Sequence, residues 1–137
     1  MLLKNQDETG CATVDLVSIN LFSGSSSVFK YGAATSYLKR DDLIERISGT
    51  SLAAGLGFPP EDMPDKFKLQ MCPGNLAVMI SDGVISGGSD DWLAELISQD
   101  EGDDPKELAE QIVRRATDRY GDEDDMMAFV ISVTDRE

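Results

Sequence analysis

Two pairs of short strand-like segments occupy the first third of the chain. Residues 11–21 are rich in Thr, Val, Ile and Leu, and a Ser-Gly-Ser-Ser turn separates them from the Val-Phe-Lys-Tyr run at 28–31. Residues 36–40 and 43–47 form a second pair around Asp41 and Asp42. Strand, turn and strand in this order predict two β-hairpins. The two aspartates suit a turn better than a metal site, because short Asp side chains satisfy local backbone groups.

Two further strands are predicted beyond a segment rich in turn-forming residues. Residues 48–66 contain three glycines and three prolines, which predicts an irregular segment on the surface. Phe67, Leu69 and Met71 then alternate with polar residues, which is the period of a strand. Residues 76–80 read Leu-Ala-Val-Met-Ile, a continuous apolar run that we expect to form a strand covered on both faces.

Two amphipathic helices are predicted in the second half. Residues 90–97 carry apolar side chains at helical spacing, and Ser89 is the expected N-cap. Residues 105–120 have an apolar or aromatic residue at every fourth position, with Asp104 as the expected N-cap and Pro105 at the first helical position. Each helix therefore has one face to bury.

A final strand is predicted at residues 126–133, which are apolar on both faces. The order is then strands, two helices and a strand that returns to the sheet. This order indicates the α+β class, a mostly antiparallel sheet arrangement with helices on one side. A chain of 137 residues has the length of one ordinary domain.

The net charge of −14 is unevenly distributed along the chain. Residues 1–81 hold 7 basic and 9 acidic groups, whereas residues 82–137 hold 5 basic and 17 acidic groups, so the two parts carry −2 and −12. Binding to a nucleic-acid backbone or an anionic membrane needs clustered Lys and Arg. The composition therefore argues against both as partners, and most of the carboxylates are expected to form a solvated surface.

The residue types present limit the chemistry that the chain can perform. The sequence contains no histidine and only two cysteines, Cys11 and Cys72, which are not in a Cys-x-x-Cys spacing. Histidine-based general-base catalysis, Ser-His and Cys-His nucleophile pairs, and a zinc site of the usual composition are therefore excluded. No apolar run approaches the roughly 20 residues needed to span a bilayer, and we expect a cytoplasmic location, although a longer parent protein could be membrane-anchored.

Two acidic turns are the candidate functional site. Asp82 and Gly83 follow the apolar run 76–80, and Asp124 and Asp125 precede the last strand. If the two runs pair antiparallel, the end of the first lies beside the start of the second, and the carboxylates converge. Mg²⁺ and Mn²⁺ prefer such oxygen ligands, together with water and a substrate phosphate. The alternatives are an ordinary Asp-Gly turn and a solvated acidic loop.

A resemblance to a known family supports the metal site. The segments concerned resemble the PP2C-like serine/threonine phosphatases, and within that superfamily the phosphatase domain of stage II sporulation protein E. They occur in the family's order over nearly the whole chain: Ala-Thr-Val-Asp-Leu at 12–16, Tyr-Gly-Ala-Ala-Thr-Ser-Tyr-Leu-Lys-Arg at 31–40, Pro-Gly-Asn-Leu at 73–76, Met-Ile-Ser-Asp-Gly-Val at 79–84, and Asp-Asp-Met at 124–126.

The resemblance implies a β-sandwich flanked by helices, with two Mn²⁺ or Mg²⁺ ions that activate a water to attack phosphoserine or phosphothreonine. Carried over by position, Asp82 and Asp124 are the expected metal ligands and catalytic residues. Gly83 is the expected close-packed glycine beside the metals, and Asp125 is a neighbour that supports the ligands. Met127 stands where the family has threonine, a change that removes no ligand.

One part of the family pattern is missing from the chain. The family's first half contributes an Asp-Gly aspartate that bridges both metals, and no residue before Cys11 matches it. We therefore expect residues 1–137 to be a partial domain, the C-terminal portion of a PP2C-like phosphatase, with half of the metal site. We also expect uncovered sheet edges and core surface, and hence a homo-oligomer.

Three functional hypotheses follow. The first is a phosphatase segment whose parent dephosphorylates a phosphoprotein, by resemblance an anti-sigma-factor antagonist in sporulation or stress signalling, with little or no activity in the isolated chain. The second is a non-catalytic regulatory or interaction module that keeps the fold. The third is an unrelated acidic domain that binds a divalent ion for structural reasons.

Overall fold

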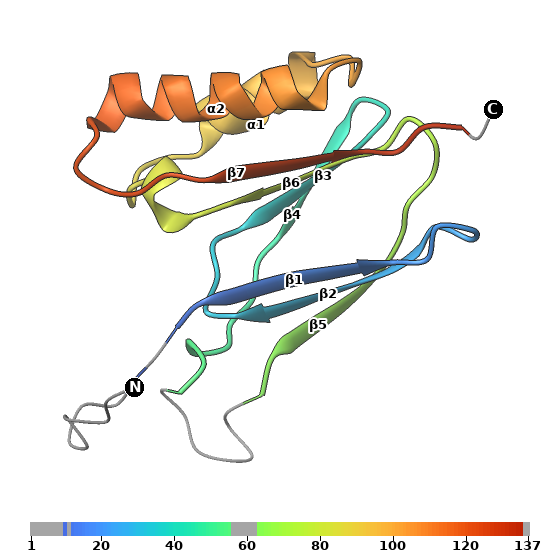
Figure 1. The fold of residues 1–137 in the computed structure, drawn as a ribbon, viewed down its shortest axis with the longest axis horizontal. Coiled ribbons are helices and arrows are strands. Elements are labelled where there is room, and N and C mark those ends of the chain that lie inside the picture. Colours follow the sequence, from blue (N-terminus) through green and yellow to red (C-terminus); the bar gives the residue numbers. More distant parts are fainter. Residues whose placement is uncertain (1–9, 11, 56–62, 136–137) are drawn as a thin grey trace, which may run out of the picture.

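The computed structural model describes residue 10 and residues 12–55 and 63–135. Two antiparallel sheets pack face to face, with two helices on the outside (Figure 1). Strands β1 (Val14–Ile19), β2 (Ser25–Tyr31) and β5 (Asp65–Gln70) form the first sheet in the order β1-β2-β5. The hairpin of β1 and β2 turns at Gly24, whose φ of 75° is accessible to glycine.

The second sheet contains four strands in the order β4-β3-β6-β7, all paired antiparallel. The second predicted hairpin forms two of them, and its Asp41 adopts a positive φ of 51° in the turn. The strands are β3 (Ser36–Arg40), β4 (Leu43–Ile47), β6 (Leu76–Ile80) and β7 (Ala128–Ser132).

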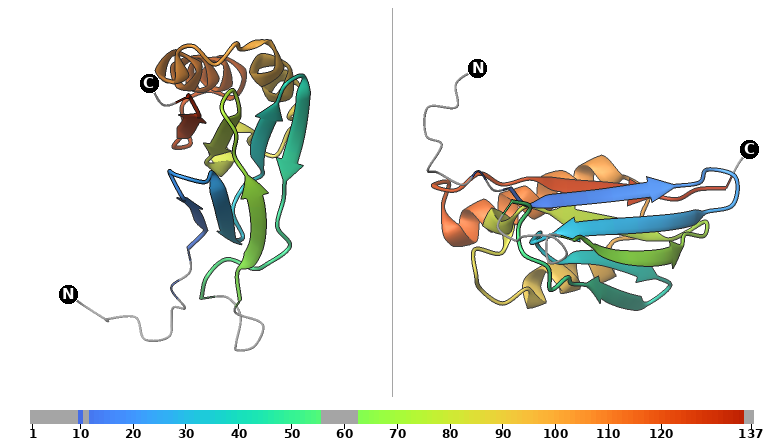
Figure 2. Two further views of the ribbon diagram at one scale, coloured as in Figure 1. Left: turned by 90° about the vertical axis from the view of Figure 1, so that its right-hand side faces the viewer. Right: turned by 90° about the horizontal axis from the view of Figure 1, so that it is seen from below.

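The two helices cover the outer face of the second sheet, as Figure 2 shows from the side. Helix α1 (Asp91–Gln99) and helix α2 (Pro105–Tyr120) bury one apolar face each against β3, β6 and β7. A short 3₁₀ turn, η1 (Asp82–Val84), connects β6 to the segment that leads into α1. This layer holds the larger core cluster, which includes Val78, Leu93 and Ile112, all inaccessible to solvent.

A smaller core lies between the two sheets. Leu38, Ile47 and Met71 are buried there, and the half-buried Phe67 and Leu69 pack against them from β5. The inward residues of β5 alternate with exposed Lys66, Lys68 and Gln70, as the sequence pattern predicts. The first sheet therefore contributes one face to the core and presents the other to solvent.

The observed elements confirm the predicted α+β sandwich with helices on one side, and several boundaries need correction. The first strand is shorter than the predicted 11–21, and the first hairpin turns at 21–24, because Ser25 and Ser26 of the predicted turn belong to β2. The first helix begins at Asp91 with Asp90 as N-cap, so the prediction of Ser89 as N-cap was wrong by one residue. The last strand is shorter than predicted, because 126 and 127 precede β7. Residue 11 and residues 56–62, parts of a predicted strand and of the predicted irregular segment, lie outside the described residues.

Candidate metal centre

The two acidic turns meet at one end of the second sheet. Strands β6 and β7 pair antiparallel with Ile80 opposite Ala128, so the residues that follow Ile80 lie beside those that precede Ala128. Asp82 and Asp124 are therefore at the same end of this strand pair although 42 positions separate them in the sequence. The antiparallel geometry on which the predicted site depends is confirmed.

Ser81 fastens the two turns together. Its N–H donates a hydrogen bond of 2.9 Å to the Met127 carbonyl, and its hydroxyl accepts one of 2.8 Å from the Met127 N–H. The Ser81 hydroxyl thus extends the hydrogen bonding between β6 and β7 by one residue, at the point where the backbone turns into η1. Met127 therefore contributes its backbone to this contact, and its side chain is exposed.

Gly83 is the point of closest contact between the two turns. A methyl group on its Cα would lie 3.1 Å from Asp124 Oδ2 and would overlap the carbonyl oxygen of Asp125. Glycine is required because no other residue leaves room for this approach. The contact places the Asp124 carboxylate directly against the residue that follows Asp82, and it involves the backbone of Asp125 rather than its carboxylate.

The carboxylates of Asp82 and Asp124 are exposed, and neither has a hydrogen-bond or ion-pair partner within the described part of the chain. The backbone of Asp82 is fixed nonetheless, because its carbonyl accepts hydrogen bonds from the N–H groups of Ile85 and Ser86. Free carboxylates on a constrained backbone are suitable ligands for Mg²⁺ or Mn²⁺. Among the described residues, however, no group of three or more His, Cys, Asp or Glu side chains converges. The residues present fit part of a divalent-cation site.

An open depression of about 500 Å³ adjoins Asp82. Ala34 and Thr35, before β3, line one side, and Gly87 and Gly88, after η1, line another. Of the two candidate ligands, Asp82 lines the depression and Asp124 does not, so the space for a substrate side chain lies beside Asp82.

Asp90 anchors the far wall of this depression. Its carboxylate accepts hydrogen bonds from Arg46 Nε at 2.8 Å, Arg46 Nη2 at 3.0 Å and the Tyr37 hydroxyl at 2.8 Å. The Arg46 guanidinium, assisted by the Tyr37 hydroxyl, holds the pKa of Asp90 below its usual range. Burial and the neighbouring Asp90 carboxylate raise the pKa of Tyr37, which stays protonated. The start of α1 is thereby fixed to β3 and β4.

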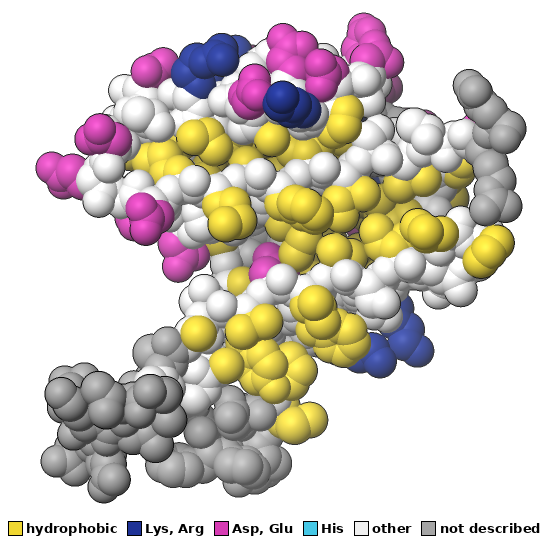
Figure 3. Space-filling model, in the orientation of Figure 1, with side chains coloured by type: hydrophobic (Ala, Val, Ile, Leu, Met, Phe, Trp, Pro, Cys, Tyr) yellow, Lys and Arg dark blue, Asp and Glu magenta, His cyan; other side chains and the backbone are white. Residues whose placement is uncertain are grey.

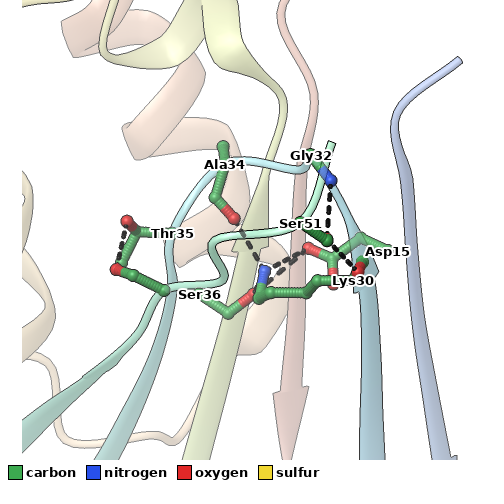
Figure 4. A network of polar contacts seen from close by, with 8 residues as sticks. Asp15, Lys30, Gly32, Ala34, Thr35, Ser36 and Ser51 are labelled. Carbon is green, nitrogen blue, oxygen red and sulfur yellow. Dashed lines mark hydrogen bonds and ion pairs between the residues drawn. The ribbon is translucent and has the colours of Figure 1, made fainter. Parts of the chain in front are cut away.

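A buried ion pair joins the two sheets behind the depression (Figure 4). The fully buried Lys30 ammonium of β2 donates to Asp15 Oδ2 at 2.9 Å, to the Ala34 carbonyl at 2.7 Å and to the Ser36 hydroxyl at 2.7 Å. These partners come from β1, from the connection between the sheets and from β3. Sequence reasoning missed this network, although a lysine at an inward position of β2, opposite an aspartate in the hairpin register, was a usable signal.

Similarity to solved structures identifies the class of protein. The chain is similar to the phosphatase domain of the cell fate determinant SpoIIE from Bacillus subtilis, in a Mn-presoaked crystal, with 27% identity and a TM-score of 0.75 over 92% of this chain and 58% of that one. It also has the fold of the catalytic domain of the serine/threonine protein phosphatase PstP in complex with two manganese ions, with a TM-score of 0.77 at 18% identity over 96% of this chain and 63% of that one. The fold is that of the PP2C-type phosphatases.

The family follows from the sequence. The profile of the family described as Stage II sporulation protein E (SpoIIE) matches residues 1–134, and the chain belongs to this family. Stage II sporulation protein E of Bacillus subtilis is 28% identical over 96% of this chain. The chain spans only 16% of the length of that relative. In the part of the chain that the structure describes, no helix is long and apolar enough to cross a membrane.

Proposed function

We propose that residues 1–137 are the C-terminal, metal-binding portion of a phosphoprotein phosphatase domain that hydrolyses phosphoserine or phosphothreonine. The observation that carries the proposal is the junction of the two acidic turns, where Gly83 packs against Asp124 and the Ser81–Met127 hydrogen bonds hold both turns in register. Membership of the family and the PP2C-type fold support the same activity.

Asp82 and Asp124 are the residues that would hold the cation. Mn²⁺ or Mg²⁺, two ions in the complete domain by resemblance, would lower the pKa of a bound water and neutralise phosphoryl oxygens. The similar structures described with manganese make Mn²⁺ the first ion to test. The chain's own contribution is to keep two unpaired carboxylates on two turns that contact each other where Gly83 meets Asp124 and the Asp125 carbonyl, with an open depression beside Asp82.

The substrate class rests on the resemblance. We propose a cytoplasmic phosphoprotein of the anti-sigma-factor-antagonist type, acting in sporulation or stress signalling, as the substrate of the parent protein. The acidic surface is compatible with a protein substrate and disfavours nucleic acid and anionic lipid.

A non-catalytic regulatory module with the same fold is the second candidate. It is favoured by one observation, namely that no third carboxylate, cysteine or histidine joins Asp82 and Asp124 among the described residues. Two carboxylates alone bind a divalent ion weakly, so we expect the isolated chain to have little or no turnover.

The two candidates are distinguished by hydrolysis of p-nitrophenyl phosphate with and without millimolar Mn²⁺. The assay compares the wild-type chain with Asp82→Asn and with the matched control Asp122→Asn, which lies in the same acidic loop as Asp124. Manganese-dependent turnover that Asp82→Asn abolishes and Asp122→Asn retains supports the phosphatase activity. Absence of turnover is expected of both candidates, because the isolated chain holds only part of the site. In that case Mn²⁺ binding that Asp82→Asn weakens and Asp122→Asn retains supports the phosphatase segment, whereas absence of such binding favours the non-catalytic module.

A further inference from the structure

The last turn of α2 contacts both of the turns that carry the candidate ligands. Figure 1 shows the C-terminal end of α2 at the end of the second sheet where η1 and the start of β7 also lie. Ala116 of α2 and Val84 of η1 are both inaccessible to solvent in one core cluster. The half-buried Tyr120 and Met126 pack against the same cluster. The helix therefore ends beside the candidate metal centre.

Tyr120 supports one wall of the depression beside Asp82. This wall consists of Gly87 and Gly88, which have no side chains to fix its position. A methyl group on the Gly88 Cα would lie 3.0 Å from the Tyr120 hydroxyl oxygen and 3.6 Å from its ring carbon Cε1. Tyr120 does not itself line the depression, so it contacts Gly88 from the helix side. The position of this wall therefore depends on the tyrosine ring.

Thr117 contacts the second turn from the same face of the helix, because positions 117 and 120 are three residues apart. Its hydroxyl donates to the Val113 carbonyl at 2.8 Å and lies 3.6 Å from the Met126 sulfur. Residues 121–125 are all exposed, whereas Met126, which follows them directly, is half-buried. The contact between Met126 and α2 therefore anchors the acidic loop at its C-terminal end.

Electrostatic repulsion opposes the approach of the two turns. Residues 122–125 read Asp-Glu-Asp-Asp, and Figure 3 shows acidic side chains gathered at this end of the molecule. In the part of the chain that the structure describes, no ion pair neutralises these carboxylates or that of Asp82. Like charges that are held close together destabilise the compact state. Contacts with a rigid element must therefore keep the turns in place before a cation binds, and the last turn of α2 supplies such contacts.

We propose that Thr117 and Tyr120 are positioning residues, which set the geometry of the cation site by holding its two turns against the end of α2. The inference rests on the proposed function, since it takes Asp82 and Asp124 as the cation ligands. Neither Thr117 nor Tyr120 lines the depression, so both act through the turns. The coupling is reciprocal: the helix end favours the arrangement that binds the cation, and a bound cation stabilises the contacts at the helix end.

The Mn²⁺ affinity of folded variants, measured by electron paramagnetic resonance, tests the role of Tyr120. Tyr120→Ala removes the ring and should weaken binding by about fivefold or more, the lower end of the usual range for coupled sites. Tyr120→Phe keeps the ring beside Gly88 and should retain most of the affinity. The control Asp104→Ala removes the cap at the other end of α2 and should leave the affinity unchanged. Circular dichroism should confirm that all three variants fold.

A pair of substitutions tests the contact between Tyr120 and Gly88 itself. Gly88→Ala places a methyl group against the Tyr120 hydroxyl and should weaken Mn²⁺ binding by about fivefold. In the Tyr120→Phe background, where this hydroxyl is absent, the same substitution should have little effect. Equal losses of affinity in both backgrounds would show that the two residues act independently and would overturn the proposal.

Amide hydrogen exchange without metal gives a second readout, which does not depend on cation affinity. Tyr120→Ala should speed exchange of the Gly88 N–H, which donates to a backbone carbonyl, by about fivefold. Thr117→Ala should do the same for the Met127 N–H, which donates to the Ser81 hydroxyl across the two turns. The Asp104→Ala control should change neither rate.

The outcomes separate this inference from the proposed function. Mn²⁺ binding that Asp82→Asn weakens and Tyr120→Ala leaves unchanged overturns the positioning role and keeps the cation site. Mn²⁺ binding that Asp82→Asn does not weaken contradicts the cation site and this inference with it. Unchanged amide exchange at Gly88 in Tyr120→Ala overturns the positioning role whether or not the chain binds Mn²⁺.

Discussion

Replacing Lys30 with methionine removes the cation that joins the two sheets. Methionine keeps most of the side-chain volume and eliminates three hydrogen bonds, to Asp15, to the Ala34 carbonyl and to Ser36. The Asp15 carboxylate would retain only the Ser36 hydroxyl, at 3.2 Å from Oδ2, since its Oδ1 already has no partner among the described residues. The variant therefore leaves a largely buried charge without compensation.

The expected cost is large compared with the stability of the chain. Breaking a buried ion pair by removing one partner costs about 3–5 kcal/mol. A domain of 137 residues is stable by roughly 7–20 kcal/mol in total. With a urea m-value of about 2 kcal/mol/M, the midpoint of unfolding should fall by about 2 M.

Urea unfolding followed by circular dichroism, at one fixed protein concentration, measures this loss. Lys68→Met on β5 is the control, because Lys68 is exposed and has no ion-pair partner among the described residues; its midpoint should move little. The double variant Lys30→Met with Asp15→Leu should recover much of the stability, because an apolar pair replaces the ionic one. A loss below about 1 kcal/mol for Lys30→Met, or additive losses in the double variant, would refute this account of the network.

Three further predictions concern the turns and the helix ends. Gly83→Ala should lower the free energy of unfolding by about 1–3 kcal/mol and weaken Mn²⁺ binding, because its methyl group meets Asp124 and Asp125. Gly74→Ala is the control for the contact, because a methyl group there meets no atom of the described residues within 4 Å, and equal melting temperatures of the two variants would contradict the close contact. The pKa of Asp90 is lowered in the folded state, so its charged form stabilises the protein fully above about pH 4, and this stabilisation is lost as the pH falls through the folded pKa. The difference in melting temperature between the wild type and Asp90→Asn should therefore shrink below about pH 4. A difference that persists undiminished to about pH 2 would contradict this role of Asp90. Asp104→Ala should cost about 1 kcal/mol by thermal unfolding, because the Asp104 carboxylate caps α2 through the Glu107 N–H at 3.0 Å, and an unchanged melting temperature would rule out this cap.

Local patterns were sufficient to predict most of the elements. Asp41 and Asp42 form the turn of the second hairpin as predicted, and the helix at 105–120 has its Asp104 cap and its Pro105 start as predicted, whereas the first hairpin turns two residues earlier than predicted. The meeting of the turns that carry Asp82 and Asp124 was also predictable, because it needs only one antiparallel pairing between two apolar runs.

Features that depend on contacts between distant segments were not predictable. The pairing of β2 with β5 and of β3 with β6 divides consecutive strands between two sheets, and the hydrophobic pattern alone does not specify this. The helix cap differed from the prediction because the Asp90 carbonyl accepts the first helical hydrogen bond, from the Ala94 N–H. The Asp90 carboxylate is bound by Arg46 and Tyr37 instead of capping the helix, and the Ser89 hydroxyl accepts from the Asp91 N–H. The role of Ser81 likewise depends on the register of β7.

Mn²⁺ binding tests most directly whether Asp82 and Asp124 form one cation site. Isothermal titration or electron paramagnetic resonance would measure the Mn²⁺ affinity of the wild-type chain, Asp82→Asn, Asp124→Asn and the loop control Asp122→Asn. We predict that the first two substitutions each weaken binding at least tenfold and that Asp122→Asn leaves it unchanged. A Mn²⁺ affinity that Asp82→Asn does not alter would contradict the assignment of the site.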